Sequence, residues 1–334
     1  MQTIQIRLTK ELVKKAQDLV DEGLYSNKSE VVRDSLRRLV FENKLVTNNQ
    51  RDFKILFTSD VHGNISQYKK LFQRAEESKA GAVIIGGDIA PKDPDHRTIE
   101  SQKEFIEKQL IPLISAFKEK NSADVFIMLG NDDFKSNEKI LEKYEKKAGY
   151  KIINQKCIRL HEGFKIIGYN FVPLTPFKYK DWEKLDLNTE EESVKRKGFL
   201  VEGVKIKNNK FIKKSFDMKR RKNTIERDLS KLFKCADHNK IIFVSHSPPY
   251  ETNLDLLKNN QHVGSAAIRR IIEEKQPYLT LHGHVHETVE VSGDFMEKIG
   301  KTISMAAGND NLNANLAIIE FNLYKSEEAK RVIV

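Results

Sequence analysis

The stretch FKILFTSDVHGN, residues 53–64, decides the fold of this chain. It is an apolar run, typical of a buried strand, that ends in Asp60-Val61-His62. Further segments downstream also place Asp, Asn or His where an apolar run ends. They are Gly87-Asp88, Gly130-Asn131-Asp132-Asp133, His246 and Gly283-His284-Val285-His286. Side chains spread over 227 residues can meet only if the fold gathers the ends of several strands at one edge.

Strands and helices are expected to alternate after residue 53. Apolar runs predict strands at 53–58, 82–87, 124–129, 164–169, 240–245 and 278–283. Helical patterns lie between several of them, at 67–75, 98–118 and 268–275. Such alternation predicts βα units with largely buried strands. The C-terminal third changes character, with meandering strands expected at TVEVSG (288–293), KTISMAAG (301–308) and LAIIEFNL (316–323).

In their order, the motifs D-x-H, GD, GN, H and GHxH resemble the calcineurin-like metallophosphoesterase family. The resemblance runs from about Phe53 to the C-terminus. Two further stretches are similar to its Icc-related predicted phosphoesterase branch: residues 169–173 with 175–177, and residues 245–249 with 262–265. The resemblance implies an α/β fold of the metallophosphoesterase type, an α+β four-layer β-sandwich flanked by helices. Asn170, His262 and Ser265 either line the pocket or cap loops, and the sequence leaves both open.

The family resemblance implies a centre of two divalent metal ions. One ion would be held by Asp60, His62, Asp88 and His286, the other by Asp88, Asn131, His246 and His284. Asp88 would bridge the ions, which makes it a catalytic residue as well as a ligand. These side chains suit Mn, Fe, Zn, Ni or Co, with Mn favoured. Such a centre hydrolyses phosphate esters with a metal-activated hydroxide and needs no covalent intermediate.

One residue departs from the family's Gly-Asn-His-Asp/Glu pattern, because Asp132 stands where the family has histidine. A carboxylate beside two cations is expected to be ionised and is a poor proton donor. The catalytic role of Asp132 is therefore open. Three explanations fit: a substrate with a good leaving group, another proton donor from the insertion, or Asp132 orienting a metal ligand. Asp133 keeps the acidic residue that ends the motif.

Residues 1–44 are expected to form a separate unit, followed by a linker at 45–52. Ile4, Ile6 and Leu8 alternate with polar residues, as in a half-buried strand. Thr9 can cap a first helix that Gly23 ends, and a second helix can begin at Asn27. One strand and two helices cannot bury this much apolar surface alone. Pairing with the same strand of a second chain would bury it and protect the strand edges.

This arrangement resembles the ribbon-helix-helix family of dimeric DNA-binding proteins. The resemblance implies a homodimer through residues 1–44 whose paired strands read the major groove. Thr3, Gln5 and Arg7 would face the bases, where Gln and Arg make bidentate contacts. The start of the second helix, at Ser26, Asn27 and Lys28, would bind a phosphate. The alternative is a dimerisation module that does not touch DNA.

The net charge of +10 is concentrated in one segment. Residues 195–234 hold 15 Lys or Arg against 4 Asp or Glu, within a charged insertion at about 178–238. The insertion either attracts nucleic acid or is simply a solvated surface.

No apolar run is long enough for a membrane span or typical of a secretory signal, so we expect a cytoplasmic protein without a membrane partner. Cys157 and Cys235 are expected to be buried thiols.

Three functions are consistent with these observations. The first, which we favour, is a dinuclear metal-dependent phosphoesterase, expected to be a phosphodiesterase, that is tethered to DNA as a dimer. The second is a diesterase for small molecules that uses residues 1–44 only to dimerise or to regulate itself. The third is a non-enzymatic or weakly active DNA-binding regulator whose phosphoesterase domain senses a nucleotide or metal.

Overall fold

The computed structural model describes residues 6–37, 52–92, 97–189, 198–235, 237–309 and 315–334. The chain forms two compact units, Met1–Asp52 and Phe53–Val334. The expected end of the first domain at residue 44 and nearly all of the expected linker lie outside the described residues. Among the described helices, none is both long and apolar enough to cross a membrane.

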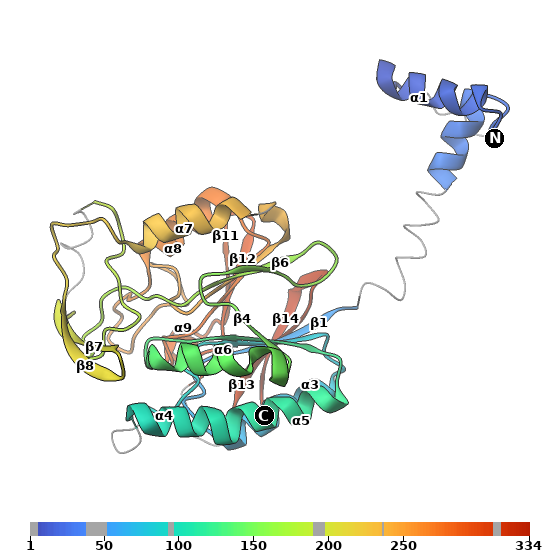
Figure 1. The fold of residues 1–334 in the computed structure, drawn as a ribbon. Coiled ribbons are helices and arrows are strands. Elements are labelled where there is room, and N and C mark those ends of the chain that lie inside the picture. Colours follow the sequence, from blue (N-terminus) through green and yellow to red (C-terminus); the bar gives the residue numbers. More distant parts are fainter. Residues whose placement is uncertain (1–5, 38–51, 93–96, 190–197, 236, 310–314) are drawn as a thin grey trace. The chain divides into compact units, whose positions relative to one another are not determined.

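The larger unit contains two six-stranded mixed sheets (Figure 1). The first sheet has the strand order β14-β13-β1-β2-β3-β4. Strands β1 to β4 run parallel, whereas β13 and β14 are antiparallel additions at one side. Their bounds are β1 Lys54–Thr58, β2 Ala82–Gly86, β3 Asp124–Met128, β4 Tyr150–Ile152, β13 Ala317–Asn322 and β14 Lys325–Ile333.

The second sheet has the order β11-β12-β10-β9-β6-β5. Its four central strands are parallel, and its two edge strands are antiparallel to their neighbours. Their bounds are β5 Cys157–Arg159, β6 Lys165–Tyr169, β9 Ile241–Ser245, β10 Leu279–His282, β11 Met296–Ile299 and β12 Thr302–Ala306. Parallel order brings the carboxyl ends of neighbouring strands to the same edge, which is where the motifs lie.

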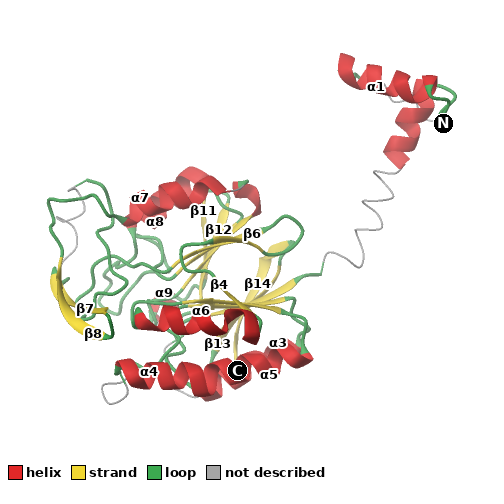
Figure 2. Ribbon diagram, viewed as in Figure 1, coloured by secondary structure: helices red, strands yellow, loops and turns green. Residues whose placement is uncertain are grey.

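Alternating side chains of the strands pack into two apolar cores, one on each face of the sheet. In β1, Ile55 and Phe57 pack with residues of the second sheet, and Leu56 packs in the core that the helices share. The helices lie outside the sheets, as Figure 2 shows. Their bounds are α3 Ile65–Glu77, α4 Ile99–Phe105, a π-helical turn Ile106–Leu110, α5 Ile111–Lys120, α6 Ser136–Ala148, α7 Ile225–Leu232 and α8 Ala266–Lys275. The expected fold class, two packed sheets flanked by helices, is confirmed.

The strand expected at 288–293 is wrong. Thr288–Ser292 form the short helix α9, which ends at Gly293 with a φ of 79°. The Thr288 hydroxyl donates to the carbonyl of Asn253 at 2.9 Å and fixes the start of the helix on a neighbouring loop. The same hydroxyl accepts the Leu256 N–H at 3.1 Å, so tertiary contacts accompany a helix where the two valines favoured a strand.

The expectation of two free thiols is also wrong. Cys157, in the edge strand β5, forms a disulfide with Cys235, in the 3₁₀ turn Phe233–Cys235 that follows α7. The two residues are 78 positions apart in the sequence, and their Cα atoms are 6.6 Å apart in the fold. Local sequence patterns carry no information about such a pair.

Because His282, at the end of β10, is buried, we expect the stability of the fold to depend on acid pH. The ring is buried against the carbonyls of Ser245 and Ser247, both 3.2 Å from Nδ1, and burial lowers the pKa of His282 to about 4. The unfolded chain binds this proton below its ordinary pKa of 6.5. His282 therefore supports stability above pH 6.5, and that support is lost as the pH falls towards 4, by about 3 kcal/mol.

We expect His282→Asn to flatten the pH dependence of the unfolding free energy between pH 4 and 6.5. Urea unfolding at several pH values measures it. His161→Gln, which changes a part-exposed ring, is the control and should leave the slope as in the wild type. An equally steep slope in His282→Asn would contradict the assignment.

The described part of the smaller unit contains two helices. Helix α1, Lys10–Asp21, is capped by Thr9, and Gly23 follows it with a φ of 76°. Residues 28–37 are helical, and the Glu30 N–H donates to Asn27 Oδ1 at 3.0 Å. Residues 6–9 lie outside any helix or strand. Thr3, Ile4 and Gln5 are outside the described residues, so the strand stays a prediction.

The start of the second helix is partly capped from within. The Ser26 N–H donates to the Glu30 carboxylate at 2.9 Å, and Ser26, Asn27 and Lys28 are all exposed. A phosphate at this end would have to approach next to the Glu30 carboxylate. The phosphate-binding role of Ser26, Asn27 and Lys28 stays a prediction, as do the base contacts of Arg7.

The basic insertion contains a two-stranded hairpin, β7 Glu202–Lys207 and β8 Lys210–Ser215. Lys207, Lys210 and Lys213 of this hairpin are exposed. The Phe211 ring contacts Phe134 at 5.5 Å between centroids. Phe134 follows the Gly130–Asp133 motif directly, so the hairpin is anchored next to the functional site.

Candidate metal centre

The predicted ligands lie where the carboxyl ends of the two sheets meet. The His246 Nδ1–H of the second sheet donates to the Gly86 carbonyl of the first at 3.0 Å. The His284 N–H donates to Asp60 Oδ1 at 3.0 Å, which joins the loops after β10 and β1. The structure thus brings together all seven side chains that the sequence proposed as metal ligands.

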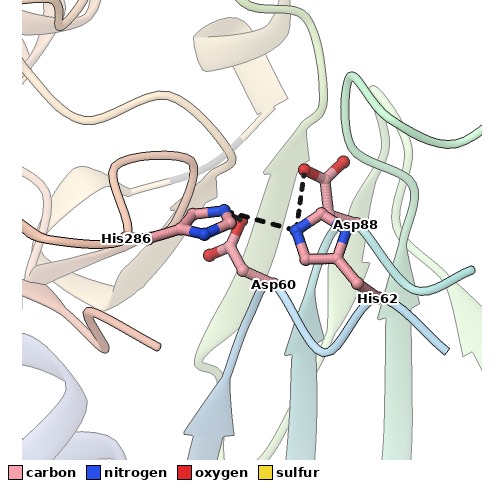
Figure 3. A group of neighbouring side chains, drawn as sticks. All are labelled: Asp60, His62, Asp88 and His286. Atoms are coloured by element: carbon pink, nitrogen blue, oxygen red, sulfur yellow. Dashed lines mark hydrogen bonds and ion pairs between the residues drawn. The ribbon is translucent and has the colours of Figure 1, made fainter. Parts of the chain in front are cut away.

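Asp60, His62, Asp88 and His286 form the first group, shown in Figure 3. Each offers one ligand atom, and these four atoms lie within 4.8 Å of one another. His62 Nε2 is 3.3 Å from His286 Nε2 and 3.7 Å from Asp88 Oδ2. Two carboxylates and two imidazoles that converge in this way suit a divalent transition metal.

Asn131, His246 and His284 form a second group with Asp88. Asn131 Oδ1 lies 3.1 Å from His246 Nε2 and 2.6 Å from His284 Nδ1. His246 Nε2 is 3.4 Å from Asp88 Oδ2. The same Asp88 oxygen therefore faces His62 of one group and His246 of the other, which is the position that a bridging ligand requires.

Four of these residues have strained backbones. Asp60, His62, Asp88 and His284 have φ values of 60°, 46°, 51° and 70°. A non-glycine residue in this region costs about 1–3 kcal/mol, and such residues cluster at functional sites. Gly87, with a φ of 114°, also leaves room, because a Cβ there would lie 2.5 Å from His246 Nδ1. The fold holds these loops in place at a cost to stability.

Charges in the group favour an ionised Asp88. Burial opposes ionisation of this carboxyl, but the charged His246 and its hydrogen bond hold the pKa of Asp88 well below the usual value. Burial also disfavours a charged His246, yet the Asp88 carboxylate raises the pKa of His246 to about 10. At His62 burial dominates and holds the pKa well below 6.5, so this ring is neutral and has a lone pair to share.

The donor set passes a test of fit for metal ions. His62 Nδ1 is buried without a hydrogen-bond partner in the described part of the chain. His62 Nε2 lies 3.7 Å from Asp88 Oδ2 and 3.3 Å from His286 Nε2, so three potential ligand atoms crowd together in a way that a cation would relieve. Because ligation needs neutral imidazole, binding would displace the proton of His246.

Asp132 acts on the site through its neighbours. Its Oδ1 accepts from Arg97 Nη2 at 2.7 Å and from Asn131 Nδ2 at 3.2 Å. Burial and the Asp88 charge raise the pKa of Asp132, against the opposing effect of Arg97. By accepting the Asn131 amide N–H, Asp132 turns Oδ1 of that amide towards His246 and His284. This contact supports the orienting role among the three explanations offered from the sequence.

We expect Asp132→Ala to weaken metal binding by roughly 10–100-fold, the effect of losing a residue that orients a ligand. It would also leave the Arg97 guanidinium, which is mostly buried, without its carboxylate. Competition with a chelating dye measures the affinity. Asp132→Asn keeps an acceptor and should lose less. Unchanged affinity in Asp132→Ala would contradict the orienting role.

Asp133 joins two of the ligand loops. Its carboxylate accepts the N–H groups of Ile89 and Ala90 after β2, and of Gly130 after β3, at 2.8–3.1 Å. Burial, together with the Asp88 charge, raises the pKa of Asp133 to about 7, against these three N–H donors. The acidic residue that ends the motif is therefore structural here.

A pocket of about 600 Å³ opens beside the two groups. Its polar lining includes Asp88, Lys92, Asn131, Asp132, His262, His284 and His286, and its apolar lining includes Pro173, Leu174, Phe177, Phe199, Tyr250 and Val263. His262 thus lines the pocket. Ser265 instead caps α8, and Asn170 is buried outside the lining.

Sequence reasoning missed two cationic residues. Lys92 Nζ lies 3.0 Å from His62 Nε2 and lines the pocket. The Arg97 guanidinium lies over the Tyr179 ring at 4.3 Å, while it pairs with Asp132. Neither residue belongs to a motif, and both follow β2 in a region without periodicity, so the sequence offered no signal for them.

Comparison with known families decides which protein class this geometry represents. The model of the calcineurin-like phosphoesterase family matches residues 53–288. The chain belongs to the calcineurin-like phosphoesterase family. As a member, it is a metal-dependent phosphoric ester hydrolase with Asp60, His62, Asp88 and His286 as a possible metal site. The ribbon-helix-helix resemblance of residues 1–44 stays a prediction.

Solved structures share the phosphoesterase fold at low sequence identity. The protein TT1561 of Thermus thermophilus is 14% identical, with a TM-score of 0.53 over 84% of this chain and 98% of that one. A second crystal structure is 15% identical, with a TM-score of 0.52 over 85% and 98%. No curated protein matches the sequence. The likeness establishes the fold of this phosphoesterase and not its substrate.

Proposed function

We propose that the protein is a phosphodiesterase with two divalent metal ions, Mn²⁺ being preferred. The observation that carries the proposal is the position of Asp88, whose Oδ2 faces His62 at 3.7 Å and His246 at 3.4 Å. Asp60, His62, Asp88 and His286 would hold one ion, and Asp88, Asn131, His246 and His284 the other. Bound ions would supply an activated water and neutralise charge on the phosphoryl oxygens.

The pocket supports a diester over a monoester. Besides the two proposed ions, Lys92 is the single Lys or Arg among the described residues that line the pocket, so the protein itself adds little positive charge for the second negative charge of a monoester. A diester carries one negative charge and a second substituent that must be accommodated. The apolar wall formed by Leu174, Phe177 and Phe199 provides a surface for it.

Each protein group has a defined task in this proposal. Lys92, beside His62, would contact a non-bridging phosphate oxygen. Asp132 keeps the Asn131 amide in the ligating orientation, and Asp133 keeps the loops after β2 and β3 together. Hydrogen bonds within the fold, such as that from the His284 N–H to Asp60, hold the ligand loops together, which reduces the cost of reorganisation.

The test is hydrolysis of bis(p-nitrophenyl) phosphate by the full chain with Mn²⁺, Mg²⁺ or Zn²⁺, compared with p-nitrophenyl phosphate. We expect Mn²⁺-dependent turnover, faster for the diester than for the monoester. A faster monoester reaction would overturn the diesterase assignment. No turnover with any of these metals would instead favour the regulator function.

We further propose that the protein is a homodimer held on DNA by residues 1–44. Within residues 6–37, six large apolar side chains are between 39% and 63% exposed: Ile6, Leu8, Leu12, Val13, Leu24 and Leu36. Ala16 and Val31 are the hydrophobic residues buried in this part of the chain. A second copy would cover this surface, and the exposed lysines of the β7–β8 hairpin would attract the DNA backbone.

A further inference from the structure

A histidine–aspartate pair lies at the pocket, outside the metal-ligand groups. His262 Nδ1 is 2.7 Å from Asp255 Oδ1. The Asp255 side chain is fully buried, whereas that of His262 is 32% exposed and lines the pocket with Asp132, His284 and His286. Within the described residues, no hydrogen bond engages Nε2 of His262. The pair therefore presents one ring nitrogen to whatever occupies the pocket.

Backbone donors hold Asp255 in place. Its carboxylate accepts N–H groups from Thr252 at 2.9 Å, Gly264 at 2.9 Å and Glu251 at 3.2 Å. These contacts fix the carboxylate, which in turn fixes the ring through Nδ1–H. An aspartate that orients a histidine in this way also balances the charge of the imidazolium.

The reaction needs a proton donor that the metal motif does not provide. Hydrolysis of a diester expels an alkoxide or phenoxide, and poor leaving groups must be protonated as they depart. The Asp132 Oδ1 atom accepts from both Arg97 and Asn131, so Asp132 serves to orient the Asn131 amide. The sequence suggested a donor from the insertion, but His262 follows β9 and lies outside it.

We propose that His262, oriented by Asp255, protonates the leaving oxygen of the substrate; this inference rests on the proposed phosphodiesterase function. As the water oxygen bonds to phosphorus, the bond from phosphorus to the leaving oxygen breaks and its electron pair stays on that oxygen. The leaving oxygen takes the Nε2 proton and departs as an alcohol. The proton released by the attacking water passes to solvent, from which the neutral imidazole regains one.

Leaving-group dependence tests this role. The substrates are methyl aryl phosphates whose aryl group runs from p-nitrophenyl, a good leaving group, to phenyl, a poor one. The proteins are the full-length wild type, His262→Gln, Asp255→Asn and the control His161→Gln, each loaded with Mn²⁺. Thermal unfolding of each variant checks the fold, and kcat and KM are measured separately.

We expect a shallow leaving-group dependence in the wild type and in His161→Gln. His262→Gln should lose roughly 10²-fold or more in kcat with phenyl and less than about threefold with p-nitrophenyl. Asp255→Asn should show the same trend with a smaller loss. If Asp255→Asn fails to fold, His262→Gln alone decides the result, because its ring is partly exposed.

The outcomes separate the two proposals. No hydrolysis of the p-nitrophenyl ester by the wild type would overturn the phosphodiesterase function and this role with it. Wild-type turnover combined with equal losses for both leaving groups, or with no loss, would overturn the proton-donor role alone. A steep leaving-group dependence already present in the wild type would also overturn it.

Discussion

Asp88→Asn is expected to abolish metal-dependent hydrolysis of bis(p-nitrophenyl) phosphate, with a loss of at least about 10²-fold. The Asp88 Oδ2 atom faces His62 and His246, whereas Oδ1 accepts the Asp132 N–H at 2.8 Å. An asparagine has the same shape but lacks the charge that a bridging ligand between two cations supplies. Initial rates with saturating Mn²⁺ measure the loss.

A surface variant provides the control for this experiment. Asp217→Asn changes an exposed carboxylate in the insertion of the same unit and should keep wild-type turnover. Because Asp88 is fully buried next to His246, circular dichroism must show that Asp88→Asn is folded. Wild-type rates in a folded Asp88→Asn protein would exclude a catalytic centre at this site.

The double variant Leu12→Glu, Leu36→Glu is expected to convert a dimer into a monomer of 38.6 kDa. The two leucines are 53% and 42% exposed, so the single chain tolerates polar groups there, whereas a dimer interface would not. Sedimentation velocity measures the mass. DNA binding by the monomer should fall by roughly 10²-fold or more, because two linked DNA contacts become one.

Ile333→Glu is the matched control for the dimer experiment. This residue is an apolar side chain of the larger unit that is 50% exposed, and its substitution should leave both mass and DNA affinity unchanged. Wild-type protein that sediments as a monomer would contradict the dimer proposal directly. A dimer without salt-dependent DNA binding would leave residues 1–44 as a dimerisation module only.

The two predictions address different levels of function. The Asp88→Asn variant tests whether the site catalyses hydrolysis. The leucine variant tests whether the protein is a dimer that binds DNA. A protein that passes the first test but binds no DNA fits the diesterase for small molecules. A protein that fails the first and passes the second is a regulator. The sequence left these functions open because the motifs encode the site and say nothing of its substrate.

The sequence by itself determined the framework of the larger unit. Apolar runs predicted the central strands β1, β2, β3, β9 and β10, because buried parallel strands are continuously apolar. Polar residues at the ends of those runs predicted which side chains would converge, because parallel strands share one carboxyl edge. These features are local and can be followed along the chain, so one sequence was sufficient for them.

The tertiary structure alone decided several contacts around the site and the disulfide. The pair Arg97–Asp132, the approach of Lys92 to His62, and the Cys157–Cys235 disulfide join residues that no periodicity connects. Helix α9 shows the same limit, because its first residue is held by contacts with the distant loop at 253–256 that the local sequence pattern does not encode. The physical reason is that periodicity specifies which face of an element is buried, whereas side-chain partners are specified by packing between elements distant in the sequence.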